Sequence, residues 1–316
     1  MEKSFRRVIV GAVLAVVVAM VAGCQQEPKT ENIKSEVDMQ EGRKIPMVEL
    51  NNGVKMPQLG VGTWTLKGDT ARENVRDALK AGFRLVDCAQ GYGNEREVGD
   101  GIRESGVPRE EIFLTTKVSP EAMRSHKVAE SIEESLEKLG TYIDLLLIHW
   151  PVKGEVEATW KVMEEFVANG KVKSIGLSNF NPHHIDDLLK VAKVRPVVNQ
   201  IEIHPYMSQQ EVAGQTFIRG IQVEAWGPLG QGNNGVLDDP AVVALAQKYG
   251  KTPAQIVLRW DLERSLVTIP RALPQHFEEN LSVLDFRLSA QDISILNGIN
   301  KGERTFYKND PDNFPW

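Results

Sequence analysis

The stretch Val86-Asp87-Cys88-Ala89-Gln90-Gly91-Tyr92-Gly93-Asn94-Glu95 ends an apolar run that begins at Phe83. A buried strand normally ends in turn residues, whereas this one presents a carboxylate at Asp87 and, five residues later, a phenol at Tyr92. Asn94 and Glu95 then begin a polar helix. This order indicates a strand that delivers groups able to handle a proton at its exit and continues into a helix. The structural alternative is that Asp87 caps a helix and Tyr92 packs at its rim.

Short apolar runs of the same kind recur along the chain. They are rich in Val, Ile and Leu and do not alternate with polar residues, which is typical of strands covered on both faces. Eight such runs are found, at residues 60–64, 84–89, 112–118, 143–150, 174–180, 196–203, 221–226 and 266–270.

Stretches with an apolar stripe and a charged face separate these runs and predict amphipathic helices. They include residues 69–81, 121–139, 155–169, 182–191, 240–249 and 253–263. Alternating strands and helices predict parallel βα units. Eight units favour a closed (β/α)8 TIM barrel over an open sheet, since eight parallel strands close around an interior that side chains just fill.

Two additions to the barrel are expected. A short hairpin over residues 47–56 precedes it, with Asn51-Asn52-Gly53 supplying the positive φ that a tight turn needs. Two extra helices, near residues 276–284 and 290–299, follow the last strand.

The composition of the 316 residues is that of an ordinary globular protein, with 41% apolar and 25% charged residues. The net charge of −6 argues against a nucleic-acid partner. Two cysteines, Cys24 and Cys88, are too few for a disulfide framework. None of the six histidines forms a His-x3-His pair and there is no Cys-x2-Cys pair, so no metal site is expected.

The N-terminus has the pattern of a secretory signal. Basic residues precede an apolar run over residues 8–23. The run ends in Val21-Ala22-Gly23-Cys24, which resembles the lipobox of bacterial lipoproteins and implies lipidation of Cys24. The expected organisation is therefore a signal peptide (1–23), a polar tether (24–44) and the barrel domain (45–316), lipid-anchored at the cell membrane or envelope. The alternatives are an uncleaved anchor helix, or a cytoplasmic protein whose true start is Met39 or Met47.

Polar residues end two further apolar runs. Lys117 ends the third, where a buried ammonium is costly unless it is paired, and His149 ends the fourth. The C-terminal ends of barrel strands meet at one rim, so these residues should lie near Asp87 and Tyr92. A lysine beside a tyrosine favours the phenolate and lowers the tyrosine pKa from its usual value near ~10, which would let Tyr92 donate a proton near neutral pH. Asp87 would hold Lys117, and His149 would orient a carbonyl oxygen; taken alone, His149 also fits a core imidazole.

Several motifs together resemble the aldo-keto reductase family. They are Asp87-Cys88-Ala89-x-x-Tyr92-Gly93-Asn94-Glu95, Thr116-Lys117, Leu147-Ile148-His149-Trp150-Pro151, Gly176-Leu177-Ser178-Asn179-Phe180 and Gln200. The resemblance runs in order from the hairpin to the C-terminus. It implies an NADPH-dependent carbonyl reductase in which Asp87, Tyr92, Lys117 and His149 form the catalytic tetrad and Tyr92 protonates the carbonyl oxygen.

The resemblance also assigns the cofactor-binding residues. Ser178, Asn179 and Gln200 match the residues that bind the nicotinamide carboxamide, and Trp226 stands where an aromatic ring stacks on the nicotinamide. Pro228 and Leu229 match the loop over the pyrophosphate. The segment Gly230-Gln231-Gly232-Asn233-Asn234-Gly235 satisfies G-x-G-x-x-G, but it does not begin a helix and is therefore rejected as a dinucleotide fingerprint.

The adenine end departs from the family pattern. Arg271-Ala272 replaces the usual Lys-Ser, and His276 replaces an arginine that meets the 2′-phosphate, while Glu279 and Asn280 match adenine contacts. Arg271 can still hold a phosphate through two hydrogen bonds. NADPH is the expected cofactor, bound less exclusively against NADH than is usual in the family.

The substrate is expected to be a small aldehyde or ketone, such as a 2-oxoaldehyde or a keto sugar. Trp64, Trp150 and the tail at residues 313–316 should line its pocket, together with Tyr92 and His149. The family resemblance implies a monomer. The alternative function is a non-catalytic, nucleotide-binding or redox-sensing subunit on the same barrel.

Overall fold

Eight parallel strands form the centre of the protein in the computed structural model, which describes residues 44–305 and 310–314. The strands are β3 (Val61–Gly62), β4 (Leu85–Asp87), β5 (Phe113–Val118), β6 (Ile143–Ile148), β7 (Val172–Ser178), β8 (Val198–Glu202), β9 (Gln222–Trp226) and β10 (Val267–Ile269). Strands that follow one another in sequence are neighbours in the sheet and pair in parallel. Seven of the eight predicted runs contain one of these strands, and the run at residues 174–180 overlaps β7, which begins two residues earlier.

The first and last strands meet and close the sheet. Leu59 forms a parallel bridge with Thr268, and the amides of Gly60 and Gly62 donate to the carbonyls of Thr268 and Pro270, both at 3.0 Å. A Cβ atom on Gly62 would lie only 3.1 Å from a carbonyl oxygen of β10, so a glycine allows this close approach. The predicted (β/α)8 barrel is confirmed.

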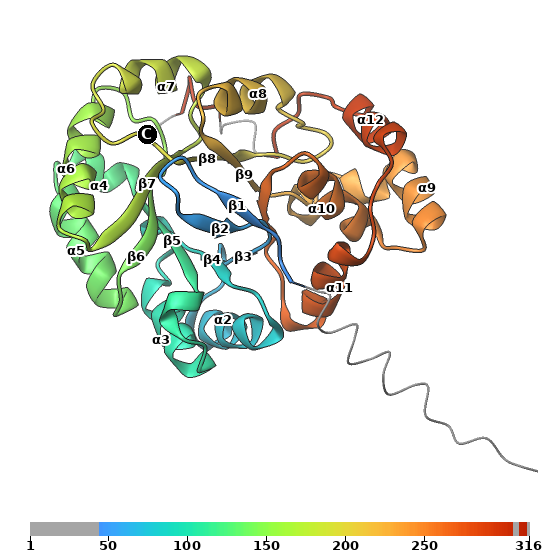
Figure 1. The fold of residues 1–316 in the computed structure, drawn as a ribbon, viewed down its shortest axis with the longest axis horizontal. Helices are drawn as coiled ribbons and strands as arrows, with labels where there is room; N and C mark the ends of the chain where they lie inside the picture. The colour runs from blue at the N-terminus through green and yellow to red at the C-terminus, as the bar shows by residue number, and fades with distance from the viewer. Residues whose placement is uncertain (1–43, 306–309, 315–316) are drawn as a thin grey trace, which may run out of the picture. The chain divides into compact units, whose positions relative to one another are not determined.

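Helices surround the barrel (Figure 1). They are α2 (Gly68–Ala81), α3 (Glu95–Ser105), α4 (Pro120–Arg124), α5 (Val128–Leu139), α6 (Val156–Ala168), α7 (Pro182–Leu189), α8 (Gln210–Ile218), α9 (Pro240–Tyr249), α10 (Pro253–Glu263), α11 (Phe277–Leu281) and α12 (Ala290–Gly298). The two expected C-terminal helices are α11, which continues into 3-10 turns at both ends, and α12. In the parts of the chain that the structure describes, no helix is both long and apolar enough to cross a bilayer.

The single helix predicted over residues 121–139 is wrong. The structure has α4 and α5 with a break between them, where His126 adopts a positive φ of 55°. The hydroxyl of Ser125 donates back to the carbonyl of Glu121 at 2.8 Å, and this local bond satisfies one of the last carbonyls of α4. The chain can therefore turn and begin α5 in a new direction.

The N-terminal hairpin closes the end of the barrel where the strands begin. Strands β1 (Met47–Glu49) and β2 (Lys55–Pro57) pair antiparallel, and Gly53 has the expected positive φ of 81°. The side chain of Asn51 donates to the carbonyls of Pro196 and Gly220, which directly precede β8 and β9 in the loops leading into them. Figure 1 shows the hairpin lying across the barrel, so the opposite rim, where the strands end, is left for a site.

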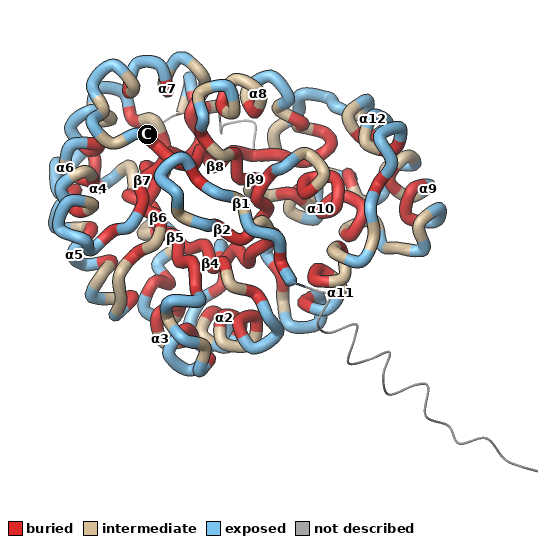
Figure 2. Tube along the Cα trace, viewed as in Figure 1, coloured by how far each residue is buried: buried red, intermediate tan, exposed pale blue. Residues whose placement is uncertain are grey.

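The barrel strands consist mostly of buried residues, as Figure 2 shows. Inside the barrel Leu85, Leu145, Leu147, Val198 and Val267 form one apolar cluster. The outward-facing residues of the same strands pack against the helices. This double burial explains why the strands read as continuous apolar runs.

Candidate active site

Three of the four predicted catalytic side chains form one hydrogen-bonded group where β4 and β5 end. Lys117 Nζ lies 2.7 Å from Asp87 Oδ1 and 3.1 Å from the Tyr92 hydroxyl, and it donates to the Cys88 carbonyl at 3.0 Å. His149, just after β6, packs its ring edge-to-face with Tyr92 at a centroid distance of 5.8 Å. The structure therefore brings the four residues together at the rim where the strands end.

Two residues that the sequence analysis did not select hold this turn in place. Thr63 donates through both its amide and its hydroxyl to the Asp87 carbonyl. Asn94, which precedes α3 and is fully buried, donates to the carbonyls of Thr63 and Leu66. In the sequence Asn94 indicates only the start of a helix, because its contacts join two loops that are brought together by the fold.

Electrostatics keep Lys117 charged. The side chain is fully buried, which by itself lowers the pKa of Lys117, but Asp87 and the Tyr92 hydroxyl raise it further than burial lowers it. His149 behaves in the opposite way, because burial and the nearby Lys117 charge hold its pKa well below the usual range. His149 is therefore a neutral imidazole at neutral pH, with one ring nitrogen that can donate a hydrogen bond.

The expectation that Lys117 lowers the pKa of Tyr92 below its usual value is wrong in its net direction. Lys117 does favour the phenolate, but burial of the phenol has the larger effect and raises the pKa of Tyr92 to about 12. Tyr92 is therefore fully protonated at neutral pH. That state suits a proton donor.

Gln200 and Glu224 extend the group across the barrel. Gln200 Nε2 donates to Asp87 Oδ2 at 2.8 Å and to Glu224 Oε2 at 2.9 Å. Gln200 and Glu224 are register partners on β8 and β9. The sequence analysis missed Glu224, although a carboxylate inside the apolar run 221–226 was a signal that could have revealed it.

The residues predicted to bind the nicotinamide also lie together. Asn179 donates to Ser178 Oγ and to the His149 carbonyl, both at 3.1 Å, and its Oδ1 accepts from Trp226 Nε1 at 2.9 Å. Asn179 has a left-handed φ of 63°, and these three bonds hold it there. Pro228 is buried and Leu229 half-buried in the loop after β9. The G-x-G-x-x-G segment contains a 3-10 turn (Gly230–Gly232) and ends before α9, as its rejection required.

The residues predicted for the adenine end differ in their surroundings. Arg271 is exposed and donates to Thr65 Oγ1 at 2.6 Å. His276 Nδ1 lies 3.1 Å from Glu279 Oε2, so the imidazole expected near the 2′-phosphate is paired with a carboxylate. Asn280 is buried, with 3% of its surface exposed.

The two predicted pocket tryptophans differ in exposure. Trp64 follows β3 and is exposed, whereas Trp150 is buried. The Phe314 ring lies flat on Trp150, with ring centroids 3.7 Å apart and planes 8° apart, and Trp150 in turn stacks beside His149 at 6.4 Å. The described part of the tail therefore reaches the site, while residues 315–316 lie outside the described residues.

Comparisons with known proteins match this arrangement. The profile described as "Aldo/keto reductase family" matches residues 58–301. Glyoxal reductase of Bacillus subtilis (strain 168) is 44% identical over 260 residues, covering 81% of this chain and 94% of that protein. The 9,11-endoperoxide prostaglandin H2 reductase of Trypanosoma cruzi (strain CL Brener) is 44% identical over 271 residues, covering 84% and 95%.

Solved structures give the same result. An aldo-keto reductase enzyme from a Medee basin deep-sea metagenome library superimposes with a TM-score of 0.79 at 39% identity, covering 82% of this chain and 97% of that one. The Bombyx mori aldo-keto reductase in complex with NADP has a TM-score of 0.79 at 36% identity, covering 86% and 99%.

Proposed function

The chain belongs to the aldo/keto reductase family and is an oxidoreductase, and from this premise we propose that it reduces small aldehydes and ketones to alcohols with NADPH. The contact that supports this most directly is the hydrogen bond of 3.1 Å between Lys117 Nζ and the Tyr92 hydroxyl. Asp87 pairs with Lys117, and the neutral His149 packs against Tyr92. The complete tetrad favours catalysis over a sensing subunit.

The residues at the ends of β7, β8 and β9 fit a nicotinamide ring. The Ser178 hydroxyl can donate a hydrogen bond, and the side-chain amides of Asn179 and Gln200 have oxygens that can accept one. These three residues therefore offer both donors and acceptors to a carboxamide. Trp226 is fixed by its bond to Asn179 and offers a flat face for stacking. Arg271 is exposed and would meet phosphate. When bound, the reduced nicotinamide supplies the hydride that reduces the carbonyl carbon.

Tyr92 acts as the general acid. Its hydroxyl is protonated at neutral pH because burial raises its pKa to about 12, and it can give this proton to a carbonyl oxygen that becomes basic as the carbon is reduced. The Lys117 ammonium then stabilises the phenolate that remains, since it lies within hydrogen-bond distance and stays charged. Asp87 keeps Lys117 in position.

His149 orients the carbonyl. Because its pKa is held well below the usual range, it remains a neutral donor and does not compete with Tyr92 as an acid. Trp150 and Phe314 form an apolar wall beside it. This setting suits a small carbonyl compound, and the Bacillus subtilis relative named glyoxal reductase supports a 2-oxoaldehyde or similar small aldehyde.

The proposal is tested by NADPH consumption with the purified chain and a panel of methylglyoxal, glyceraldehyde, keto sugars and bulkier ketones, repeated with NADH. We expect turnover with the small aldehydes. Absence of turnover with every member of the panel, while nucleotide still binds, would contradict the proposed reaction and favour a nucleotide-sensing role.

For the N-terminal segment we propose a lipid anchor at Cys24 that holds a monomeric enzyme at the cell membrane or envelope. The support is the sequence Val21-Ala22-Gly23-Cys24 after an apolar run. Cys24, the predicted signal peptide and nearly all of the predicted tether lie outside the described residues, so this proposal rests on sequence alone.

A further inference from the structure

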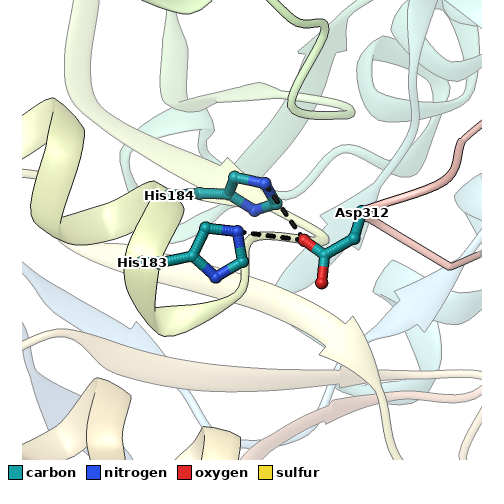
Figure 3. Close-up of side chains that lie close together, drawn as sticks. All are labelled: His183, His184 and Asp312. Carbon is teal, nitrogen blue, oxygen red and sulfur yellow. Dashed lines mark ion pairs between the residues drawn. The ribbon is translucent and has the colours of Figure 1, made fainter.

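Two histidines and one carboxylate, none of them a tetrad residue, converge at the start of α7 (Figure 3). His183 and His184 are the second and third residues of α7, and Asp312 belongs to the C-terminal tail. Asp312 Oδ1 lies 3.0 Å from His183 Nε2 and 3.3 Å from His184 Nε2. The three ligand atoms all lie within 4.8 Å of one another.

Two of these separations are close to the edge length of a tetrahedral metal site. Zinc binds imidazole nitrogen and carboxylate oxygen at about 2.0–2.2 Å, so two ligand atoms of a tetrahedral site lie roughly 3.3 Å apart. The two contacts to Asp312, at 3.0 and 3.3 Å, are close to this length. His183 is exposed, with 59% of its side chain accessible, and can turn to shorten the third edge.

We propose that His183, His184 and Asp312 bind a divalent transition metal ion of the zinc class, with solvent completing its coordination. Two imidazoles and one carboxylate are a donor set that suits Zn²⁺ and its neighbours Co²⁺ and Ni²⁺. All three side chains are partly or largely exposed, so an ion can enter from solution.

The surroundings of Asp312 support a cation. Asn181 Nδ2 donates to Asp312 Oδ2 at 3.0 Å, which orients the carboxylate and leaves Oδ1 for the ion. Asp187 and Asp310 also act electrostatically on His184. Their negative charge opposes the partial positive charge at the N-terminus of α7, which would otherwise disfavour a metal ion.

Metal binding has one identifiable local cost. His184 Nδ1 accepts a hydrogen bond from the Asn181 amide at 3.2 Å, so its Nε2 now carries the ring proton. Coordination through Nε2 moves that proton to Nδ1 and breaks this bond. The other half of the capping box, in which the Asn181 side chain accepts from the helix backbone, is retained.

The position of the site gives it a consequence for the pocket. The ion would join α7 to the tail, and two residues after Asp312 the tail places Phe314 on Trp150. Metal would therefore hold the tail against the pocket wall. The sequence analysis expected no metal site because it considered only His-x3-His and Cys-x2-Cys spacing. Here two adjacent histidines meet a carboxylate that is distant in the chain.

The test is isothermal titration calorimetry of the full chain with Zn²⁺ alone, which does not depend on reductase activity. We expect one site that is weakened at least tenfold in the His184→Gln and Asp312→Asn variants. The matched control is His126→Gln, since His126 pairs with one carboxylate, Glu155, at 3.3 Å and has no second histidine there. This control should bind Zn²⁺ as the unchanged chain does.

Two outcomes would overturn the proposal: no Zn²⁺ binding by the unchanged chain, or equal binding by the Asp312→Asn variant. His183→Gln changes an exposed side chain and provides a second variant if either of the others fails to fold, which thermal unfolding without metal would reveal. The affinity of this variant for Zn²⁺ should also be at least tenfold lower. Visible absorption of the Co²⁺ form gives an independent readout, since the tetrahedral bands should disappear in the same variants.

Discussion

Asp87 and Glu224 share one donor, because Gln200 Nε2 lies 2.8 Å from Asp87 Oδ2 and 2.9 Å from Glu224 Oε2. All three side chains are at most 2% exposed. Lys117 pairs with Asp87 at 2.7 Å, and Glu224 has no ion-pair partner among the described residues. Burial, followed by the negative charge of Asp87, therefore raises the pKa of Glu224 to about 8, and Glu224 is a neutral acid at pH 7.

The Glu224→Gln variant should lose an inflection from the pH profile of carbonyl reduction. In the unchanged enzyme, ionisation of Glu224 above about pH 8 places a second buried negative charge beside Asp87. This charge disturbs the hydrogen bond from Gln200 to Asp87. We expect kcat/KM to fall about tenfold per pH unit above that point, as for a single ionisation. Tyr92, with a pKa of about 12, titrates too high to cause this fall. If the kcat/KM profile of the variant still has an inflection near pH 8, another group is responsible for it.

The same variant should also change how stability depends on pH. An unfolded glutamate loses its proton near 4.5, whereas folded Glu224 keeps it to about pH 8. The folded state therefore binds more protons between these values, and the free energy of unfolding falls as pH rises through this window. Glu224→Gln should make this fall smaller in urea unfolding measured from pH 4.5 to 8.

The Asp261→Asn variant separates these two effects and serves as the control for the kinetic one. Asp261 is fully buried on α10, accepts from Thr268 Oγ1 at 2.8 Å, and has a pKa raised to about 7 by burial. It should also reduce the fall in stability with pH, but it makes no contact with the tetrad residues in the structure. Its kcat/KM profile should keep the inflection near pH 8.

Tyr92→Phe should lower kcat by about a hundredfold to ten-thousandfold and leave nucleotide binding intact. General acid catalysis contributes about 10²–10⁴ in rate, and the phenylalanine ring preserves the contact with His149 while removing the proton. The measurements are turnover and nucleotide fluorescence titration. Tyr206→Phe is the control, since its hydroxyl bonds to Asp239; retained turnover in Tyr92→Phe would refute the assignment of the acid.

The sequence predicts more of the fold than of the site. Each strand reads as an apolar run because helices cover its outer face and other strands its inner face, so all eight could be found in the sequence. The residues of the tetrad could be selected because polar groups at strand ends are unusual. Glu224 could not be connected to Gln200, because their contact depends on strand register. The raised pKa of Tyr92 depends on burial, which spacing does not reveal.

Phe314→Ala should raise KM for small aldehydes by about tenfold with little change in kcat. Phe314 stacks on Trp150 at 3.7 Å, and an aromatic pair is worth about 0.5–1.5 kcal/mol beyond its buried area. Losing the ring loosens the pocket wall but leaves Tyr92 and Lys117 in place. Steady-state kinetics with methylglyoxal measure the change; an equal loss in kcat would show that the tail also positions the tetrad.

Cys24→Ala should move the protein from the membrane fraction to the soluble fraction. The cysteine is the acceptor of the lipid in the proposed lipobox, and its loss removes the anchor without changing the described residues. Blotting of both fractions, with and without protease added to intact cells, gives the location and the exposed face. A soluble product of reduced length from the unchanged gene would exclude the lipoprotein and favour a start at Met39 or Met47.

The nucleotide preference should be weak and should depend on Glu279. Its carboxylate lies 3.1 Å from His276, where the 2′-phosphate of NADPH is expected to bind, and like charges repel. We therefore expect Kd values for NADPH and NADH within tenfold of each other. Glu279→Gln keeps a hydrogen-bond acceptor for Thr252 but removes the charge, so it should tighten NADPH binding several-fold and leave NADH unchanged. If Glu279→Gln tightened the binding of both nucleotides equally, Glu279 would not act through the 2′-phosphate. A hundredfold preference for NADPH in the unchanged chain would contradict the relaxed specificity.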